Sequence, residues 1–220
     1  MSGDVEAVVF DYGGVLTTPV ADSIAGWLEV DGIDPDSFSR TLKAWLSSDA
    51  PPGTPVHRLE TGELTAEEFG DLLAAELARH DGDAVVADGI VGRLFAGMRV
   101  EPAMFDLVDD LRALGMRTGL LSNSWGNTYP RERIAEAFDG IVISGEVRLR
   151  KPQPEIYGLA LDGLGVAPEH AVFVDDAEPN LVGARAIGLR TVLHTDPAGT
   201  RAALAALVPG LAPAALRSHR

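Results

Sequence analysis

Short runs of apolar residues recur along the chain, and five of them have the length and composition of β-strands. They cover residues 7–10, 118–121, 141–143, 171–174 and 191–193. Because these runs are apolar throughout and do not alternate with polar positions, they are typical of parallel strands buried on both faces. The pattern therefore predicts one parallel sheet with other elements packed against both of its sides.

Segments with a helical spacing of apolar residues lie between the strands. They cover residues 101–114, 153–164 and 178–187, and glycine follows them at Gly115, Gly165 and Gly188. Glycine just beyond the last apolar position is typical of a helix end. Alternating strands and helices predict right-handed crossovers, and hence an α/β fold. From Pro197 onward we expect a last helix and a loose end.

Residues 17–99 contain no strand pattern, and this interval is far longer than one crossover helix requires. We expect helices over residues 34–47, 65–80 and 83–95, with Gly89 and Gly92 weakening the third. Thr65 and Glu68 have the spacing of a capping box. Residues 1–16 and 100–220 are thus expected to form the α/β core, and residues 17–99 a small all-helical lobe inserted after the first strand.

Composition narrows the classes of function. The 220 residues are 46% hydrophobic, which suffices for one core and a small second lobe. The formal net charge of -15 disfavours nucleic acid and anionic membranes as main partners, but leaves a small phosphorylated molecule open. Cysteine is absent, which excludes disulfides and thiolate catalysis. Because we find no secretory leader and no apolar run of about 18 residues, we expect a cytoplasmic protein.

Polar residues directly follow three of the predicted strands. Asp11 follows the first, Ser122-Asn123 the second and Asp175-Asp176 the fourth. Open α/β sheets build their sites at such strand ends. A carboxylate there can attack phosphorus or bind a metal, and a hydroxyl beside free backbone N–H groups can hold phosphate oxygens. Two adjacent carboxylates repel each other unless a cation lies beside them, and Mg²⁺ prefers such oxygen ligands.

Other residues extend this set. Lys151 is a cation in an acidic chain, and Pro152 restricts its backbone. Gly13 and Gly14 allow a ligand to approach the backbone closely, and Asn180 could hydrogen-bond a loop carboxylate. Each residue alone also suits an ordinary role as a turn residue, a helix cap or a solvated side chain. Together, at matching strand ends, they favour phosphoryl transfer.

The four motifs resemble those of the haloacid dehalogenase-like (HAD) superfamily. They are Phe10-Asp11-Tyr12-Gly13-Gly14-Val15-Leu16, Leu121-Ser122-Asn123, Lys151-Pro152 and Val174-Asp175-Asp176. The resemblance covers essentially the whole chain, and it implies a Rossmann-like parallel sheet flanked by helices with a C1-type cap. Residues 151–157 and the acidic pair resemble most the N-terminal phosphatase of soluble epoxide hydrolase and bacterial sugar-phosphate phosphatases of the same branch.

The resemblance implies a Mg²⁺-dependent phosphomonoester hydrolase that acts on a small phosphorylated metabolite as a monomer or homodimer. Asp11 would be the nucleophile that forms an aspartyl-phosphate, and Lys151 would act with it. The ligands of Mg²⁺ would be Asp11, Asp175 and the backbone carbonyl of Gly13. The phosphoryl group would be held by Ser122, Asn123 and Lys151. Asp176 would support the metal or Lys151, and Asn180 is a further supporting residue.

One position departs from the family pattern. Family phosphatases usually carry a second Asp two residues after the nucleophile as general acid/base, and Gly13 occupies that position here. Such a group contributes about 10²- to 10⁴-fold in rate. Another group or water could supply the proton, the substrate could have a good leaving group such as an anomeric or acyl phosphate, or the protein could be slow or inactive. His57, Glu60 and Glu63 are candidate substitutes, although each also suits a surface position.

Two alternatives stay open at this point. A catalytically degraded protein that binds a phosphorylated ligand for regulation would also explain Gly13. A 2-haloacid dehalogenase would lack the second Asp too, but it needs no metal, and its usual aromatic residue stands two positions after the nucleophile, whereas Tyr12 stands one after. Trp27, Trp45 and Trp125 could stack on a substrate or fill the core.

Overall fold

The computed structural model describes residues 4–46, 50–126 and 129–213 of the chain. Within them, one parallel sheet has the strand order β3-β2-β1-β4-β5. The strands are β1 (Ala7–Phe10), β2 (Arg117–Ser122), β3 (Gly140–Ile143), β4 (Ala171–Asp175) and β5 (Arg190–Leu193). The five predicted strands and the α/β class are therefore confirmed.

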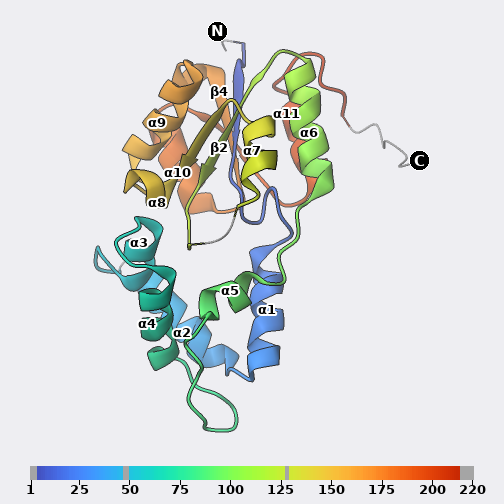
Figure 1. Ribbon diagram of the computed structural model, residues 1–220. Helices are drawn as coiled ribbons and strands as arrows, with labels where there is room; N and C mark the ends of the chain where they lie inside the picture. The colour runs from blue at the N-terminus through green and yellow to red at the C-terminus, as the bar shows by residue number, and fades with distance from the viewer. Residues whose placement is uncertain (1–3, 47–49, 127–128, 214–220) are drawn as a thin grey trace, which may run out of the picture.

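Helices cover both faces of the sheet (Figure 1). On one face lie α6 (Pro102–Ala113), α7 (Arg131–Ala137) and α11 (Pro197–Ala205). On the other lie α9 (Pro154–Leu164) and α10 (Glu178–Ala186), with the short helices α8 (Ser144–Val147) and η1 (Pro168–His170) in the loops. None of the helices in the described part of the chain is long and apolar enough to span a membrane.

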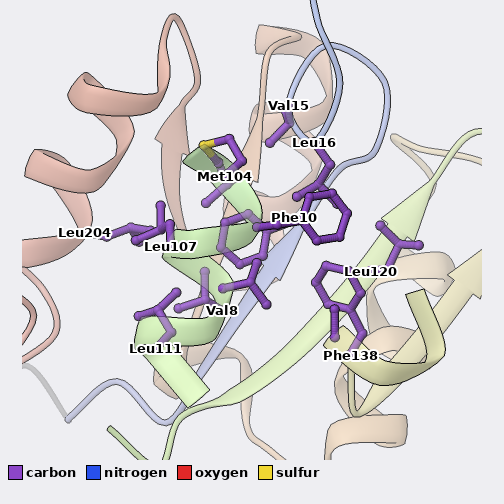
Figure 2. Close-up of a cluster of buried hydrophobic side chains, with 14 of the residues drawn as sticks. Val8, Phe10, Val15, Leu16, Met104, Leu107, Leu111, Leu120, Phe138 and Leu204 are labelled. Atoms are coloured by element: carbon purple, nitrogen blue, oxygen red, sulfur yellow. The ribbon is translucent and has the colours of Figure 1, made fainter. Parts of the chain in front are cut away.

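The side chains of the central strand β1 alternate between the two faces, and both sets are buried. Val8 and Phe10 pack against α6, as Figure 2 shows. Ala7 and Val9 belong to the cluster under α9 and α10. Because water is excluded on both sides, β1 has no polar position until it ends. The first polar residue, Asp11, is thereby fixed at the middle of the sheet edge.

A helical insertion follows β1, as predicted. It contains α1 (Val20–Asp31), α2 (Pro35–Leu46), α3 (Pro55–Glu60), α4 (Ala66–Glu76) and α5 (Ile90–Phe95). These helices share a buried cluster of their own and lie beyond the end of the sheet (Figure 1). An antiparallel bridge between Thr17 and Val100 joins the two chain segments that connect the insertion to the sheet.

Trp27 and Trp45 contribute to the core of the insertion. Trp27 meets Phe38 with ring centroids 5.5 Å apart, and Trp45 meets Phe69 at 5.8 Å. Both contacts are edge-to-face, a favourable geometry for aromatic pairs. Of the two roles considered for these tryptophans, the structure therefore favours core packing.

Helix boundaries in the insertion differ from the prediction. The helix expected over residues 83–95 begins only at Ile90, because Gly89 precedes it with a left-handed φ of 63°. The helix expected to reach residue 80 ends at Glu76, where the backbone becomes extended. Its capping box is confirmed, since Thr65 and Glu68 exchange hydrogen bonds of 2.8 and 3.1 Å. The expected helix end at Ser47 and the chain after residue 213 lie outside the described residues.

Candidate active site

Three of the predicted site residues converge at the carboxyl ends of adjacent strands. Asp11 follows β1, Ser122 ends β2 and Asp175 ends β4. The three residues are 8%, 2% and 0% exposed, respectively. The parallel register of β1 with both neighbours brings their side chains to one edge of the sheet. This is the juxtaposition that the strand pattern predicts.

Lys151 reaches this group from the loop before α9. Its side chain is 1% exposed, and Nζ lies 2.7 Å from Asp11 Oδ1 and 2.7 Å from Asp175 Oδ2. The peptide bond between Lys151 and Pro152 is cis. A buried ammonium is tolerated when close carboxylates replace its lost hydration. The alternative of a solvated loop lysine is therefore wrong.

Burial and charge act in opposite directions on these groups. Burial alone would lower the pKa of Lys151, but Asp11 and Asp175 outweigh it and raise that pKa above its ordinary value. Burial raises the pKa of Asp11 to about 7, against the opposing effect of Lys151 and with the help of Asp175. Lys151 therefore stays protonated and positively charged. Asp11 would be fully ionised only if another positive charge lay nearby.

Asp175 is held in one orientation by α10. Its Oδ1 accepts a hydrogen bond from the backbone N–H of Ala177 at 2.8 Å, and Asn180 Nδ2 lies 3.1 Å from both carboxylate oxygens. Tyr157 of α9 in turn donates to the carbonyl of Asn180 at 2.7 Å. Asn180 thus hydrogen-bonds a carboxylate as expected, but this carboxylate, Asp175, is the last residue of β4 and does not lie in a loop. Two helices position Asp175.

The side chain of Asn123 has a different partner from the predicted phosphate. Its Oδ1 accepts from the backbone N–H of Lys151 at 2.8 Å, and its Nδ2 donates to the carbonyl of Lys151 at 3.1 Å. Asn123 therefore positions Lys151 through its side chain. Ser122 Oγ lies 3.0 Å from the hydroxyl of Tyr129, a residue that the sequence did not single out.

A divalent metal ion fits the acidic side of this group. Carboxylate oxygens of Asp11, Asp175 and Asp176 lie within 4.8 Å of one another. Burial and the charge of Asp175 raise the pKa of Asp176, which shows the mutual repulsion. Three carboxylates face the single ammonium of Lys151, so a cation with a preference for oxygen ligands, such as Mg²⁺, would relieve the excess negative charge.

The two glycines after β1 differ in what their positions allow. Gly14 has a φ of 78°, and a Cβ there would lie 2.3 Å from Asp176 Oδ2, so only glycine fits. At Gly13, by contrast, a Cβ would come within 4 Å of one described side-chain atom, Val20 Cγ2, at 3.4 Å. The position of the missing acid/base can therefore accept a side chain.

A cavity of about 690 Å³ lies over these residues, between the sheet and the insertion. Its floor carries Asp11, Ser122, Lys151 and Asn180. Its roof consists of apolar side chains from α1, α2 and the segment around α5: Val20, Ile24, Leu42, Leu46, Phe95 and Met98. A ligand that reaches Asp11 would thus be enclosed on its other side by apolar surface.

Glu60 and Arg150 connect the insertion to the sheet beside the cavity. Glu60, at the end of α3, is 5% exposed; it accepts a hydrogen bond from Arg150 Nε and another from Trp125 Nε1, the latter at 3.1 Å. The expected surface position of Glu60 is therefore wrong, and the structure makes Arg150 its ion-pair partner. His57 lines the cavity, and Glu63 is exposed on the surface.

Comparison with known sequences places the chain in a family. The sequence model of the haloacid dehalogenase-like hydrolases matches residues 5–188. Acyl-CoA dehydrogenase family member 10 of Mus musculus is 30% identical over 197 residues, which cover 84% of this chain and 17% of that protein. Bifunctional epoxide hydrolase 2 of Rattus norvegicus is 27% identical over 210 residues, covering 88% of this chain and 37% of that protein. The chain thus spans well under half the length of these two relatives.

A solved structure supports the same fold. A HAD family enzyme of Bacteroides thetaiotaomicron, in complex with magnesium and inorganic phosphate, superposes with a TM-score of 0.58 at 22% identity. The superposition covers 86% of this chain and 93% of that one. The sequence match includes all four motifs and the helical insertion. The chain belongs to the haloacid dehalogenase-like hydrolases, as its motifs predicted.

Proposed function

We propose that this protein is a Mg²⁺-dependent phosphomonoester hydrolase that forms an aspartyl-phosphate on Asp11. The observation that carries the proposal is the buried Lys151, whose Nζ lies 2.7 Å from both Asp11 and Asp175 on the floor of the cavity. A nucleophilic oxygen, a fixed cation and the hydroxyl of Ser122 thus face one ligand. The magnesium and phosphate bound by the Bacteroides enzyme support a phosphate ligand here.

Asp11 would act as the nucleophile. One carboxylate oxygen bonds to phosphorus while the ester bond of phosphorus breaks, and the leaving oxygen takes the electron pair and then a proton from solvent. Water next attacks phosphorus, the bond to Asp11 breaks, and phosphate leaves with the carboxylate regenerated. Lys151, Ser122 and the backbone N–H of Asn123 would hold the transferring oxygens in both steps.

Asp11, Asp175 and the carbonyl of Gly13 would hold Mg²⁺, with Asp176 and Asn180 as supporting residues. The ion would supply positive charge that favours the ionised nucleophile and reduces its repulsion from the phosphate. Hydrogen bonds already orient both oxygens of Asp175. This part of the site is therefore prearranged by the protein's own groups.

We assign residues 1–16 and 100–220 to a catalytic core and residues 17–99 to a cap. The bridge between Thr17 and Val100 supports this division, because it closes the insertion at its base. Since the core supplies the charged floor and the cap supplies the apolar roof, the core would act on the phosphate of a small metabolite and the cap would select its organic part.

The test is phosphate release from a panel of phosphorylated metabolites and p-nitrophenyl phosphate, first with Mg²⁺ and then with EDTA. We expect release that EDTA lowers by at least about 10²-fold and that Asp11→Asn abolishes. Asp22→Asn is the matched control, since Asp22 is exposed on α1. Release that persists in Asp11→Asn would overturn the mechanism, and release that EDTA does not change would overturn the role of the metal.

Gly13 favours a second candidate function, which is ligand binding without turnover. Such a protein would hold a phosphate between Lys151 and Ser122 yet release none from any ester. Calorimetric titration with inorganic phosphate would detect the binding. Gly13→Asp would then be expected to restore turnover, because the position has room for a side chain next to Val20.

The geometry does not support a dehalogenase. Tyr12 is 5% exposed and packs against Tyr129, with ring centroids 4.9 Å apart and the two rings tilted by 55°. The aromatic residue beside Asp11 therefore belongs to the core and is absent from the described lining of the cavity. The cluster of three carboxylates also favours a metal, which dehalogenases do not need.

A further inference from the structure

We infer that the substrates are aryl phosphomonoesters, in which a phenolic oxygen carries the phosphate and the ring carries an apolar substituent. This inference rests on the proposed phosphatase activity and narrows its substrate class. Two independent observations lead to it: the chemistry of the cavity roof, and the absence of a side chain at Gly13.

The roof of the cavity favours an apolar group. Ile24, Leu42, Phe95 and Met98 line it and are only partly buried, and Leu46 is 43% exposed. A ligand that covers these side chains removes apolar surface from water, which is favourable in proportion to the area covered. A sugar in the same space would place hydroxyl groups against side chains that cannot hydrogen-bond them.

The charged side chains that line the cavity are already paired with side chains of opposite charge. Among the described lining residues, Asp11 pairs with Lys151 and Glu60 pairs with Arg150. Burial and the charge of Arg150 lower the pKa of His57, which favours its neutral form. Apart from the phosphate position at Lys151, the described lining thus provides no unmatched charge for a second ionic group on the substrate. A singly phosphorylated, otherwise uncharged molecule fits this lining.

The missing acid/base at Gly13 restricts the leaving group. When the ester bond breaks, the leaving oxygen takes the electron pair, and an alkoxide would need a proton from a nearby acid. Glu60, a candidate donor, is occupied by Arg150 and Trp125. A phenolate needs no such donor, because a phenol has a pKa of about 10. The bond from Asp11 to phosphorus can then form while the phenolate leaves and later takes a proton from water.

Two aromatic residues provide a surface for the ring. Phe95 and Trp125 both line the cavity and meet edge-to-face, with ring centroids 5.9 Å apart and an angle of 84°. The hydrogen bond from Trp125 to Glu60 fixes the indole. Fixed aromatic surfaces favour a flat aromatic partner over a flexible chain of the same area.

The experiment compares kcat/KM for phenyl phosphate, 4-butylphenyl phosphate, butyl phosphate and glucose 6-phosphate. We expect phenyl phosphate to exceed butyl phosphate by at least about 10²-fold, and Gly13→Asp to reduce this ratio to about 10 or less by supplying the acid. Each methylene of the 4-alkyl group that enters the cavity should raise kcat/KM about fourfold.

A pair of leucine variants tests the roof. Leu42→Gln should reduce the ratio of kcat/KM for 4-butylphenyl phosphate to that for phenyl phosphate, whereas Leu72→Gln should not, because Leu72 is exposed on α4 and outside the cavity lining. Equal or better turnover of glucose 6-phosphate or butyl phosphate would overturn the inference and leave the phosphatase intact. Phosphate release from none of the four esters or the metabolite panel would overturn the proposed function itself.

Discussion

The floor and the roof of the cavity are built in opposite ways. On the floor, charged side chains are buried and held by directional contacts, such as the two 2.7 Å ion pairs of Lys151. The roof offers apolar side chains that are partly exposed and make no directional contact with the floor. The end of a strand can hold a polar atom in place to within a fraction of an ångström. The helical cap instead offers the ligand an apolar surface without fixed contact points.

Because of this difference, we expect the floor to contribute to catalysis and the roof to substrate binding. A group that acts on a bond in the transition state must be placed accurately, so changes to the floor should lower kcat. Apolar area contributes to binding in the ground and transition states alike, so changes to the roof should act mainly on KM.

Lys151→Met should have the largest effect, on activity and on stability alike. It leaves the carboxylates of Asp11 and Asp175 buried without their cation, which costs about 3–5 kcal/mol. Urea denaturation measured in EDTA gives the free energy of unfolding. Lys43→Met is the control, since Lys43 is exposed on α2. Equal stability of the two variants would contradict the buried ion pairs.

Gly14→Ala should have an intermediate effect. A Cβ in this left-handed position would lie 2.3 Å from Asp176 Oδ2, so the carboxylate or the loop must move, at a cost of about 1–3 kcal/mol. We expect kcat to fall and the Mg²⁺ concentration at half-maximal rate to rise. Gly158→Ala is the matched control, because a Cβ there meets open space on α9. If the Mg²⁺ dependence of Gly14→Ala were unchanged, a role of Asp176 in supporting the metal would be contradicted.

Glu60→Gln should have the smallest effect and should act on the cap. It removes the charged partner of Arg150 while Trp125 keeps an acceptor, and we expect a loss of about 1 kcal/mol. With the cap held less firmly, KM should rise severalfold while kcat changes about twofold or less. Glu63→Gln, at a side chain 59% exposed, is the control. A fall in kcat without a change in KM would assign Glu60 to the floor.

The sequence predicts the sheet better than the cap. The run Ala7–Phe10 is apolar because both sheet faces are covered, and that signal is local. The boundary at Ile90 depends on the left-handed conformation of Gly89, and the end of α4 depends on Leu77 entering a cluster shared by distant helices. Such tertiary effects override local helical preference.

The residues of the candidate site were also only partly predictable from the sequence. The positions of Asp11, Ser122 and Asp175 follow from strand ends, which the chain pattern reveals. The pairing of Glu60 with Arg150 joins residues 90 positions apart, and the hydrogen bond between Ser122 and Tyr129 joins a strand end to a residue seven positions later. Neither contact produces a periodic pattern or a characteristic spacing in the sequence. The residues that make these contacts therefore could not be distinguished from surface residues by sequence alone.

The central place of β1 in the sheet also bears on how the chain is made. Among the strands of this sheet, β1 leaves the ribosome before the others, but its neighbour β2 begins at Arg117 and its other neighbour β4 at Ala171. The helices α1 to α5 complete their cluster within that interval. At 5–20 residues per second, β1 would wait on the order of ten seconds before its second partner is synthesised. We expect the cap to gather first on the nascent chain, and the apolar segment Ala7–Phe10 to be the part most in need of a chaperone until β4 emerges.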